Sequence, residues 1–191
     1  MPIIIKIYNK VIYRLWIKLK LKKVGSRFRI GYSSELTTPA YFSIGDNFFT
    51  GPRNYLSTNR YNPVSIGDHV MFGPECMVIG GNHDSTFTDG HMSFNSREDH
   101  MKSSIVIEDG VWIGARSMIL SNAYIGEGAI VGAMSLVNHE IPPYCTAVGI
   151  PAKKFMRRFQ NNDDLQKLLN NVNSKYSLKQ LLSIYKDHGI Q

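Results

Sequence analysis

A period of six residues dominates the second half of the chain and constrains its fold more than any other feature. Six consecutive β-branched residues hold this spacing: Ile107, Ile113, Ile119, Ile125, Val131 and Val137. The residues four positions after them are mostly small: Val111, Ser117, Ala123, Ala129, Ser135 and Ile141. A sixfold period fits neither an amphipathic helix, whose period is about 3.6, nor the alternation of an ordinary sheet strand.

The same phase continues upstream of residue 107. The pairs Ile66-Gly67 and Phe72-Gly73 hold it closely, and Ile44-Gly45 holds it more loosely. Three units of six make a coil with corners at glycines, which tolerate a positive φ. Stacked coils bury their aliphatic residues inside a prism, because one unit cannot bury itself alone. We therefore predict a mainly β repeat domain over residues 26–158.

Composition narrows the class of protein. The chain has 191 residues, of which 43% are hydrophobic and 19% are charged, so we expect a folded domain. Its net charge of +7 favours acidic partners, but no nucleic-acid-binding motif is present, and we expect no nucleic acid. The two cysteines, Cys76 and Cys145, suggest buried thiols and a reducing, cytoplasmic location.

Residues 1–25, "MPIIIKIYNKVIYRLWIKLKLKKVG", are both apolar and basic. Lys6, Lys10, Arg14 and Lys18 interrupt the apolar run every four residues, which argues against a signal peptide and a transmembrane span. The spacing predicts a basic amphipathic helix. Two interpretations stay open: a helix on an anionic membrane surface at the inner face of the cytoplasmic membrane, or a helix packed on the body or a neighbouring subunit.

The repeat is interrupted at two places inside the domain. Leu56 and Ile66 are ten residues apart, which predicts a short extruded turn at residues 59–62. Val78 and Ile107 are 29 residues apart, and the intervening residues 84–104 are polar and lack the apolar period. A long excursion from a regular scaffold is more often functional than accidental.

His83 lies where this excursion begins. Acyl transfer to a hydroxyl needs a base, and histidine suits the task because its pKa lies near neutrality. The chain contains no nucleophile-elbow motif, so direct attack without a covalent enzyme intermediate is expected. The histidines form no close-spaced pair, and we expect no metal.

Two stretches carry a family resemblance: "SIGDHVMFGPECMVIGGNH" (65–83) and "IEDGVWIGARSMILSNAYIGEGAIVGAMSLVNHEIPPYCTAVGIPAKKFMRR" (107–158). They resemble the hexapeptide-repeat acyltransferases, and most of all the O-acetyltransferases of bacterial sugars and surface polysaccharides. The resemblance implies a left-handed parallel β-helix, a homotrimer with sites between the prisms, and acetyl-CoA as acyl donor. The left hand is implied by the resemblance alone, because general crossover rules favour the right hand.

The resemblance also implies roles for particular residues. The family's base lies 17 residues beyond the isoleucine of an Ile-Gly-Asp coil, which is His83 here. Trp112 corresponds to a tryptophan that flanks the acetyl end of the donor, beside the base of a neighbouring subunit. Ala115 and Ala133 correspond to backbone contacts with the pantetheine arm, and Lys153 to a cation after the Pro-Ala pair. The chain departs from the family at 138–139, where Asn-His replaces a frequent Thr-Lys.

The end of the domain adds a basic cluster to these candidates. Lys153, Lys154, Arg157 and Arg158 follow a proline-containing turn, where cations would pair with the phosphates of coenzyme A. Downstream, residues 159–191 form a C-terminal extension in which 163–172 and 177–189 show helical spacing. Ser177 can cap the second helix and Gly189 can end it.

Three residues are candidate acceptor contacts. Asn54 lies near the place where an asparagine of similar proteins touches the sugar, and Asp84 and His91 share the excursion with His83. Asp84 is also a candidate to orient the imidazole.

The sequence therefore predicts an acetyl-CoA-dependent O-acetyltransferase acting on a hydroxyl of a bacterial surface glycan (capsule, exopolysaccharide or lipopolysaccharide), with His83 as general base. Three alternatives stay open: an N-acetyltransferase of a nucleotide-linked amino sugar, a xenobiotic acetyltransferase, and a scaffold without enzymatic activity.

Overall fold

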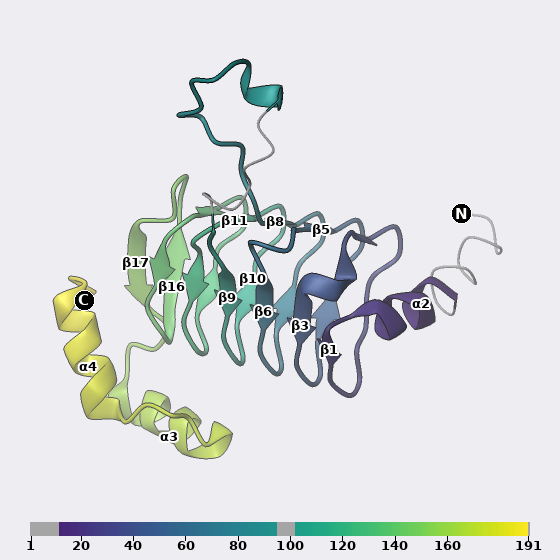
Figure 1. The fold of residues 1–191 in the computed structure, drawn as a ribbon. Coiled ribbons are helices and arrows are strands. Elements are labelled where there is room, and N and C mark those ends of the chain that lie inside the picture. Colours follow the sequence, from purple (N-terminus) through teal and green to yellow (C-terminus); the bar gives the residue numbers. More distant parts are fainter. Residues whose placement is uncertain (1–11, 95–101, 191) are drawn as a thin grey trace.

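The structure is a computed structural model that describes residues 12–94 and 102–190, and it is built on three sheets of short strands (Figure 1). Sheet A contains β1 (Lys23–Val24), β3 (Phe42–Ile44), β6 (Val64–Ile66), β9 (Ile105–Ile107), β12 (Tyr124–Ile125) and β15 (Glu140–Ile141). Sheet B contains β4 (Phe49–Thr50), β7 (Met71–Phe72), β10 (Trp112–Ile113), β13 (Ile130–Val131), β16 (Cys145–Val148) and β17 (Lys154–Arg157). Sheet C contains β2 (Glu35–Leu36), β5 (Tyr55–Ser57), β8 (Met77–Ile79), β11 (Met118–Leu120) and β14 (Leu136–Val137).

From β2 onward the chain visits these sheets in rotation, so that each strand pairs with the strand one coil before and one coil after it. These pairings are parallel, and the antiparallel pair of β16 with β17 ends the stack. In the regular part the register joins residues eighteen positions apart, as in Ile113↔Val131 and Ile119↔Val137. This register confirms the predicted coil of three six-residue units.

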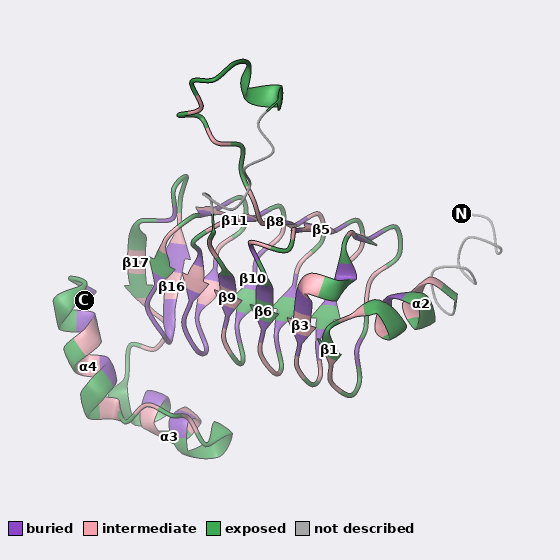
Figure 2. Cartoon of the chain, viewed as in Figure 1, coloured by how far each residue is buried: buried purple, intermediate pink, exposed green. Residues whose placement is uncertain are grey.

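The interior of the stack is built from the repeat itself. The six β-branched residues of the sixfold period are at most 1% exposed, and they point inward from all three sheets. The small positions are equally buried, including Ser117 and Ala129 at 0%. Figure 2 shows the resulting alternation of buried and exposed residues along the strands. Cys76 and Cys145 are free buried thiols, as the sequence predicts.

The connections from sheet C to sheet A are enlarged in three consecutive coils. The first contains the short 3-10 helix η2 (Pro39–Tyr41), and the second contains the turn at 58–62. The third is the excursion at 84–104, which projects from the body and contains η3 (Met92–Phe94) (Figure 1). All three enlargements therefore lie along one edge of the stack, which we call the C–A corner.

The N-terminal segment is only partly the helix that the sequence predicts. The described helix is α2 (Tyr13–Lys20), while residues 1–11 lie outside the described part of the chain. The prediction of a helix up to residue 25 is wrong, because Lys23–Val24 form β1 and pair with β3 in sheet A. Backbone hydrogen bonds to a sheet neighbour thus begin the stack before residue 26.

The C-terminal extension forms two helices, α3 (Asn162–Val172) and α4 (Leu178–Asp187). Ser177 caps α4 through a capping box with Gln180, as the sequence predicts. The hydroxyl of Tyr185 in α4 donates a buried hydrogen bond of 2.7 Å to the carbonyl of Tyr144. This contact fixes α4 against the last coil, at the end of the stack opposite to α2 (Figure 1).

Candidate active site

His83 leaves the wall of the stack through two glycines. β8 ends at Ile79, and Gly81 has a φ of +100°, which few other residues adopt. A Cβ at Gly80 would lie 2.2 Å from Oγ1 of Thr58, and this contact leaves no room for a side chain. The pair of glycines before "NHD" therefore lets the chain pass over the preceding coil and turn outward.

The root of the excursion is tied to the coils on both sides of it. The amide of Gly81 donates to Oγ of Ser121 at 2.8 Å, and the returning strand is held by Asn62, whose Nδ2 donates to Oγ of Ser103 at 2.7 Å. These bonds place His83 on a supported base at the C–A corner.

Sequence analysis missed the positioning roles of Ser121 and Asn62. The repeat contains the signal for Ser121, because the pairing of Val78 with Ile119 brings Gly80 and Ser121 to the same place in adjacent coils. The position of Asn62 depends on the shape of the 58–62 turn, for which the sequence offers no register.

The side chains nearest to His83 in sequence have different surroundings. His83 itself is exposed. One carboxylate oxygen of Asp84 accepts hydrogen bonds from the amide and the hydroxyl of Thr86, at 2.9 and 2.6 Å, which closes a turn at the start of the loop. His91 is exposed further along the loop and packs edge-to-face on Phe94. Residues 95–101 of the excursion lie outside the described residues.

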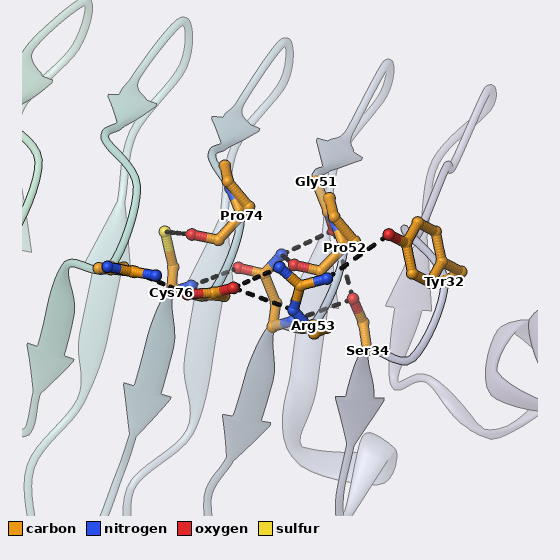
Figure 3. Close-up of polar contacts among 10 residues, drawn as sticks. Tyr32, Ser34, Gly51, Pro52, Arg53, Pro74 and Cys76 are labelled. Carbon is orange, nitrogen blue, oxygen red and sulfur yellow. Dashed lines mark hydrogen bonds and ion pairs between the residues drawn. The ribbon is translucent and has the colours of Figure 1, made fainter. Parts of the chain in front are cut away.

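Asn54 is not a surface residue, and its prediction as an acceptor contact is wrong. Its side chain is 1% exposed, accepts from the amide of Cys76 at 2.9 Å and donates to the carbonyl of Gly51 at 2.7 Å. Its amide accepts support from Ser34 Oγ at 3.1 Å, so it joins three adjacent coils, as its partners in Figure 3 show. A buried amide with these partners has a structural role.

Trp112 lies on the outer face of sheet B. It is 48% exposed and pairs in register with Met71 in the preceding coil, which pairs in turn with Phe49. All three side chains are large, apolar and more than one third exposed. They form a continuous stripe on the outer face of sheet B, which we call the sheet B stripe.

Ala115 and Ala133 lie one above the other at the corner between sheets B and C. The carbonyl of Ala115 accepts from the amide of Met134 at 2.9 Å, and a Cβ at Gly114 would lie 2.5 Å from the amide nitrogen of Ala133. Ala133 is exposed and Ala115 is half-buried. Small side chains thus leave the backbone accessible along this corner.

An ion-pair ladder stands beside these alanines. Glu75 accepts from Arg116 Nε at 2.6 Å and from Arg53 Nε at 2.9 Å, and Figure 3 shows Arg53 also reaching Tyr32. The hydrogen bonds from Arg53 and Arg116 lower the pKa of Glu75. The ladder keeps these exposed side chains along the edge of the corner.

The basic cluster at the end of the domain divides into two pairs. Lys153 and Lys154 are exposed, but Arg157 and Arg158 are half-buried against their own chain. Arg157 donates to Asn162 Oδ1 at 3.1 Å, and Arg158 donates to the carbonyl of Gly128 at 2.8 Å. The prediction that all four cations are free for phosphates is wrong, because β17 turns the two arginines toward the body.

The structure does not bring the candidate donor and base residues together within one chain. In a three-sided stack, the C–A corner with His83 lies opposite the outer face of sheet B with Trp112. Two cavities of about 430 and 630 Å³ lie along sheet A and under the C-terminal helices, and His83 lines neither. Among the described residues, no group of three His, Cys, Asp or Glu side chains is placed to hold a metal.

Comparisons with known proteins identify the repeat. The family model "Bacterial transferase hexapeptide (six repeats)" matches residues 104–139 and confirms the resemblance read from the sequence. A galactoside O-acetyltransferase of Escherichia coli is 29% identical over 128 residues, which are 65% of this chain and 61% of that protein. A chloramphenicol acetyltransferase of Morganella morganii is 40% identical over 124 residues, 57% of this chain and 59% of the relative.

A third relative, from Escherichia coli, is described as a lipopolysaccharide biosynthesis O-acetyl transferase. It is 30% identical over 104 residues, which are 52% of this chain and 53% of that protein. The chain thus spans less than two thirds of the length of each of these relatives.

A solved structure shares the architecture. The hexapeptide-repeat acetyltransferase of Vibrio cholerae has a TM-score of 0.64 and 25% identity, covering 80% of this chain and 82% of its own. The Vibrio protein has also been solved with acetyl coenzyme A bound. A mainly β fold with parallel sheets and a few helices is therefore common to both.

Proposed function

We propose that this chain, which carries the hexapeptide repeat of bacterial transferases, is an acetyl-CoA-dependent O-acetyltransferase. Its acceptor is a sugar hydroxyl of a bacterial surface glycan, and it works in the cytoplasm. The fold that goes with this proposal is a left-handed parallel β-helix assembled as a homotrimer. The observation that favours it most is the position of His83, exposed at the root of a supported excursion.

His83 would act as the general base. It accepts the proton of the acceptor hydroxyl as the oxygen attacks the thioester carbonyl carbon, and the carbon–sulfur bond then breaks. The imidazolium returns this proton to the departing thiolate, so the products are an acetyl ester and coenzyme A. A base held on a rigid wall suits this step, because proton transfer requires the donor and acceptor atoms to be aligned.

The donor would lie along the corner of Ala115 and Ala133. A thin pantetheine arm fits against small side chains there, and the exposed Lys153 and Lys154 can pair with phosphate groups. Arg157 and Arg158 hold the end of the stack together and do not enter the proposal as phosphate contacts. The relatives are acetyltransferases, and the Vibrio structure contains acetyl coenzyme A, which supports this donor.

A site shared between subunits follows from the opposite positions of His83 and Trp112. One chain exposes the base on one side of the prism and the sheet B stripe on the other. In a cyclic trimer, the sheet B side of one copy can face the C–A corner of the next, which completes three equivalent sites. The sheet B stripe is the kind of apolar surface that such contacts cover.

The acceptor is proposed from the relatives together with the excursion. A galactoside and lipopolysaccharide biosynthesis stand in the names of two relatives, and the polar residues of the excursion suit a hydroxylated sugar. Asp84 and His91 remain candidate acceptor contacts on this loop.

A small xenobiotic is the second candidate acceptor. The highest identity among the three relatives, 40%, belongs to the chloramphenicol acetyltransferase. Its acetylation would use the same base and the same donor corner, and the two candidates differ only in what the excursion encloses.

The test compares His83→Ala with His188→Ala, an exposed histidine at the C-terminal end of α4. Release of the coenzyme A thiol is measured with acetyl-CoA and either lactose or chloramphenicol as acceptor. Turnover should fall by about 10²–10⁴-fold in His83→Ala and stay within about twofold in His188→Ala. Calorimetry should show unchanged binding of coenzyme A in both variants.

A folded His83→Ala protein with near-normal turnover would overturn the assignment of the base. Turnover with chloramphenicol and none with the sugar would select the xenobiotic as acceptor. Absence of coenzyme A binding in the wild-type protein would contradict the acyltransferase itself.

A further inference from the structure

α2 is fixed to the stack by one of its faces. Ile17 is fully buried, and Arg14 donates two hydrogen bonds to the carbonyl of Phe28, through Nε at 2.8 Å and through Nη2. The hydroxyl of Tyr13 accepts from the amide of Leu36 at 2.9 Å. These three side chains share one face of the helix, so α2 lies against the first coils in a defined rotation.

The opposite face of α2 is apolar and exposed. Ile12 precedes the helix and continues this face, and Leu15, Trp16 and Leu19 are 57%, 47% and 84% exposed. Trp16 stacks on Tyr13 with ring centroids 6.1 Å apart, which fixes the indole at the edge of the face. Helices on soluble proteins usually turn the apolar face inward, and this one is reversed.

Cations flank the exposed apolar face. Lys18 and Lys20 lie on the two sides of the stripe at a helical period, and Lys22 and Lys23 follow directly. The first 34 residues contain nine Lys and Arg and no Asp or Glu. The other 157 residues contain 13 basic and 15 acidic residues, so the whole positive net charge is concentrated at this end of the molecule.

We propose that α2 and the basic residues around it bind the surface of an anionic lipid bilayer, with Leu15, Trp16 and Leu19 inserted among the headgroups. An apolar stripe bordered by lysines and marked by a tryptophan is the pattern of an interfacial helix. The segment binds on the surface and does not span, since no helix in the described part of the chain is long and apolar enough to cross a bilayer.

A bilayer fits this face better than a second copy of the chain does. The cores of protein interfaces are poor in lysine, and two copies meeting here would bring together cations of the same segment. Asp46, which lies near Lys23, is on sheet A's side of the stack and not on the exposed face of α2. An anionic surface supplies the missing opposite charge over the whole patch.

The geometry also orients the molecule on the membrane. α2 covers the N-terminal end of the stack, and α3 and α4 lie at the far end (Figure 1). In sheet C, β8 is the third strand from that N-terminal end, and neighbouring strands are about 4.8 Å apart. The root of the excursion therefore stands about 10 Å along the stack from the first strand of sheet C, on the membrane side of the prism.

The test is co-sedimentation of the full chain with vesicles of phosphatidylcholine, with or without about one third phosphatidylglycerol. Binding should require the anionic lipid and should weaken strongly when NaCl is raised from about 0.1 M to about 1 M, which shortens the Debye length from about 10 Å to about 3 Å. Trp16 fluorescence should shift to the blue on binding, and Trp16→Leu should lose that shift while binding is retained.

Two pairs of variants separate the apolar and electrostatic contributions. Leu15→Ser with Leu19→Ser should weaken binding at least about tenfold, and Val172→Ser, an exposed site at the far end, should not. Lys18→Glu with Lys20→Glu should weaken binding at least about tenfold, whereas Lys167→Glu with Lys179→Glu in α3 and α4 should leave it unchanged.

Three results would overturn the proposal. One is absence of binding to the anionic vesicles by the wild-type chain at millimolar lipid. Another is equal binding by the leucine variant and its control. The third is a change of particle mass in light scattering, without lipid, when Leu15 and Leu19 are replaced, because a second copy would then cover this face. Since none of these measurements uses acetyl transfer, they are independent of the proposed function.

Discussion

At the scale of single residues, the wall of the stack contains polar side chains whose bonds are satisfied inside it. Asn54 joins the carbonyl of Gly51 to the amide of Cys76 across adjacent coils, and Ser117 donates to the carbonyl of Gly132 at 2.9 Å. Such groups cost free energy if one partner is removed, because the other is left buried without a hydrogen bond.

Asn54→Ala should therefore destabilise the fold without changing acceptor recognition. We expect the free energy of unfolding to fall by about 1–3 kcal/mol, because the amide of Cys76 loses its acceptor. Urea denaturation measures this change, and Asn138→Ala, at an exposed position, is the control. A raised acceptor KM with unchanged stability would instead restore Asn54 as a substrate contact.

The residue scale is also where sequence analysis was least complete. The repeat gave the inward direction of every lead residue, because a side chain in register with its neighbours in the stack has one environment. It could not show that Asn54 points inward, since the extruded turn at 58–62 follows it and breaks the register used for comparison. The partners of Arg157 and Arg158 could not be predicted either, because they depend on the antiparallel strand β17.

At the scale of elements, the C-terminal helices are held to the stack by one carboxylate. Glu108 follows β9, and it accepts from the ammonium of Lys175 in the α3–α4 connection and from the hydroxyl of Tyr124. Its second oxygen accepts from the amide of Glu127 at 2.9 Å. Burial acts to raise the pKa of Glu108, but these hydrogen bonds outweigh it and lower the pKa below its ordinary value of 4.5.

This lowered pKa predicts how stability depends on pH. Because the folded chain holds the proton less tightly, the carboxylate stabilises the fold above about pH 4.5, and the contribution is lost as the pH falls through the folded pKa. Glu108→Gln should lower the free energy of unfolding at neutral pH by about 1–3 kcal/mol, and its difference from the wild type should shrink under acid conditions.

The measurement is a series of urea denaturations between about pH 3 and pH 7, with the exposed Glu140→Gln as control. A difference between Glu108→Gln and the wild type that stays constant across this range would show that the charge of Glu108 contributes nothing.

Elements could be predicted where the sequence is periodic and not elsewhere. The coils followed from the sixfold spacing, and α4 followed from Ser177 and its helical pattern. The end of α2 at Lys20 could not be seen, because Lys and Val continue a plausible helix until a sheet neighbour takes their backbone groups. The 3-10 turns η2 and η3 have no period, so sequence analysis missed them.

At the scale of the whole molecule, the base and the sheet B stripe face in opposite directions. A single prism therefore cannot contain a complete site of the proposed kind, and the trimer supplies the missing side. Mixing of two inactive variants tests this arrangement.

His83→Ala and Trp112→Ala should each have low activity alone and regain activity when co-expressed. In a random trimer of equal amounts, about a quarter of the sites combine a native His83 from one chain with a native Trp112 from the next. Coenzyme A release by the purified mixture should approach this fraction of the wild-type rate. No recovery in mixtures shown to be mixed by mass spectrometry would place both residues in the site of a single chain.

The three enlarged connections at the C–A corner have a consequence for how such a protein can change. Insertions and deletions at this edge leave every paired strand in its register, because the coil resumes at sheet A whatever length precedes it. The acceptor range can therefore diversify through loop length while the scaffold keeps its stability. The molecule separates a variable edge from two invariant ones, much as a handle accepts interchangeable blades.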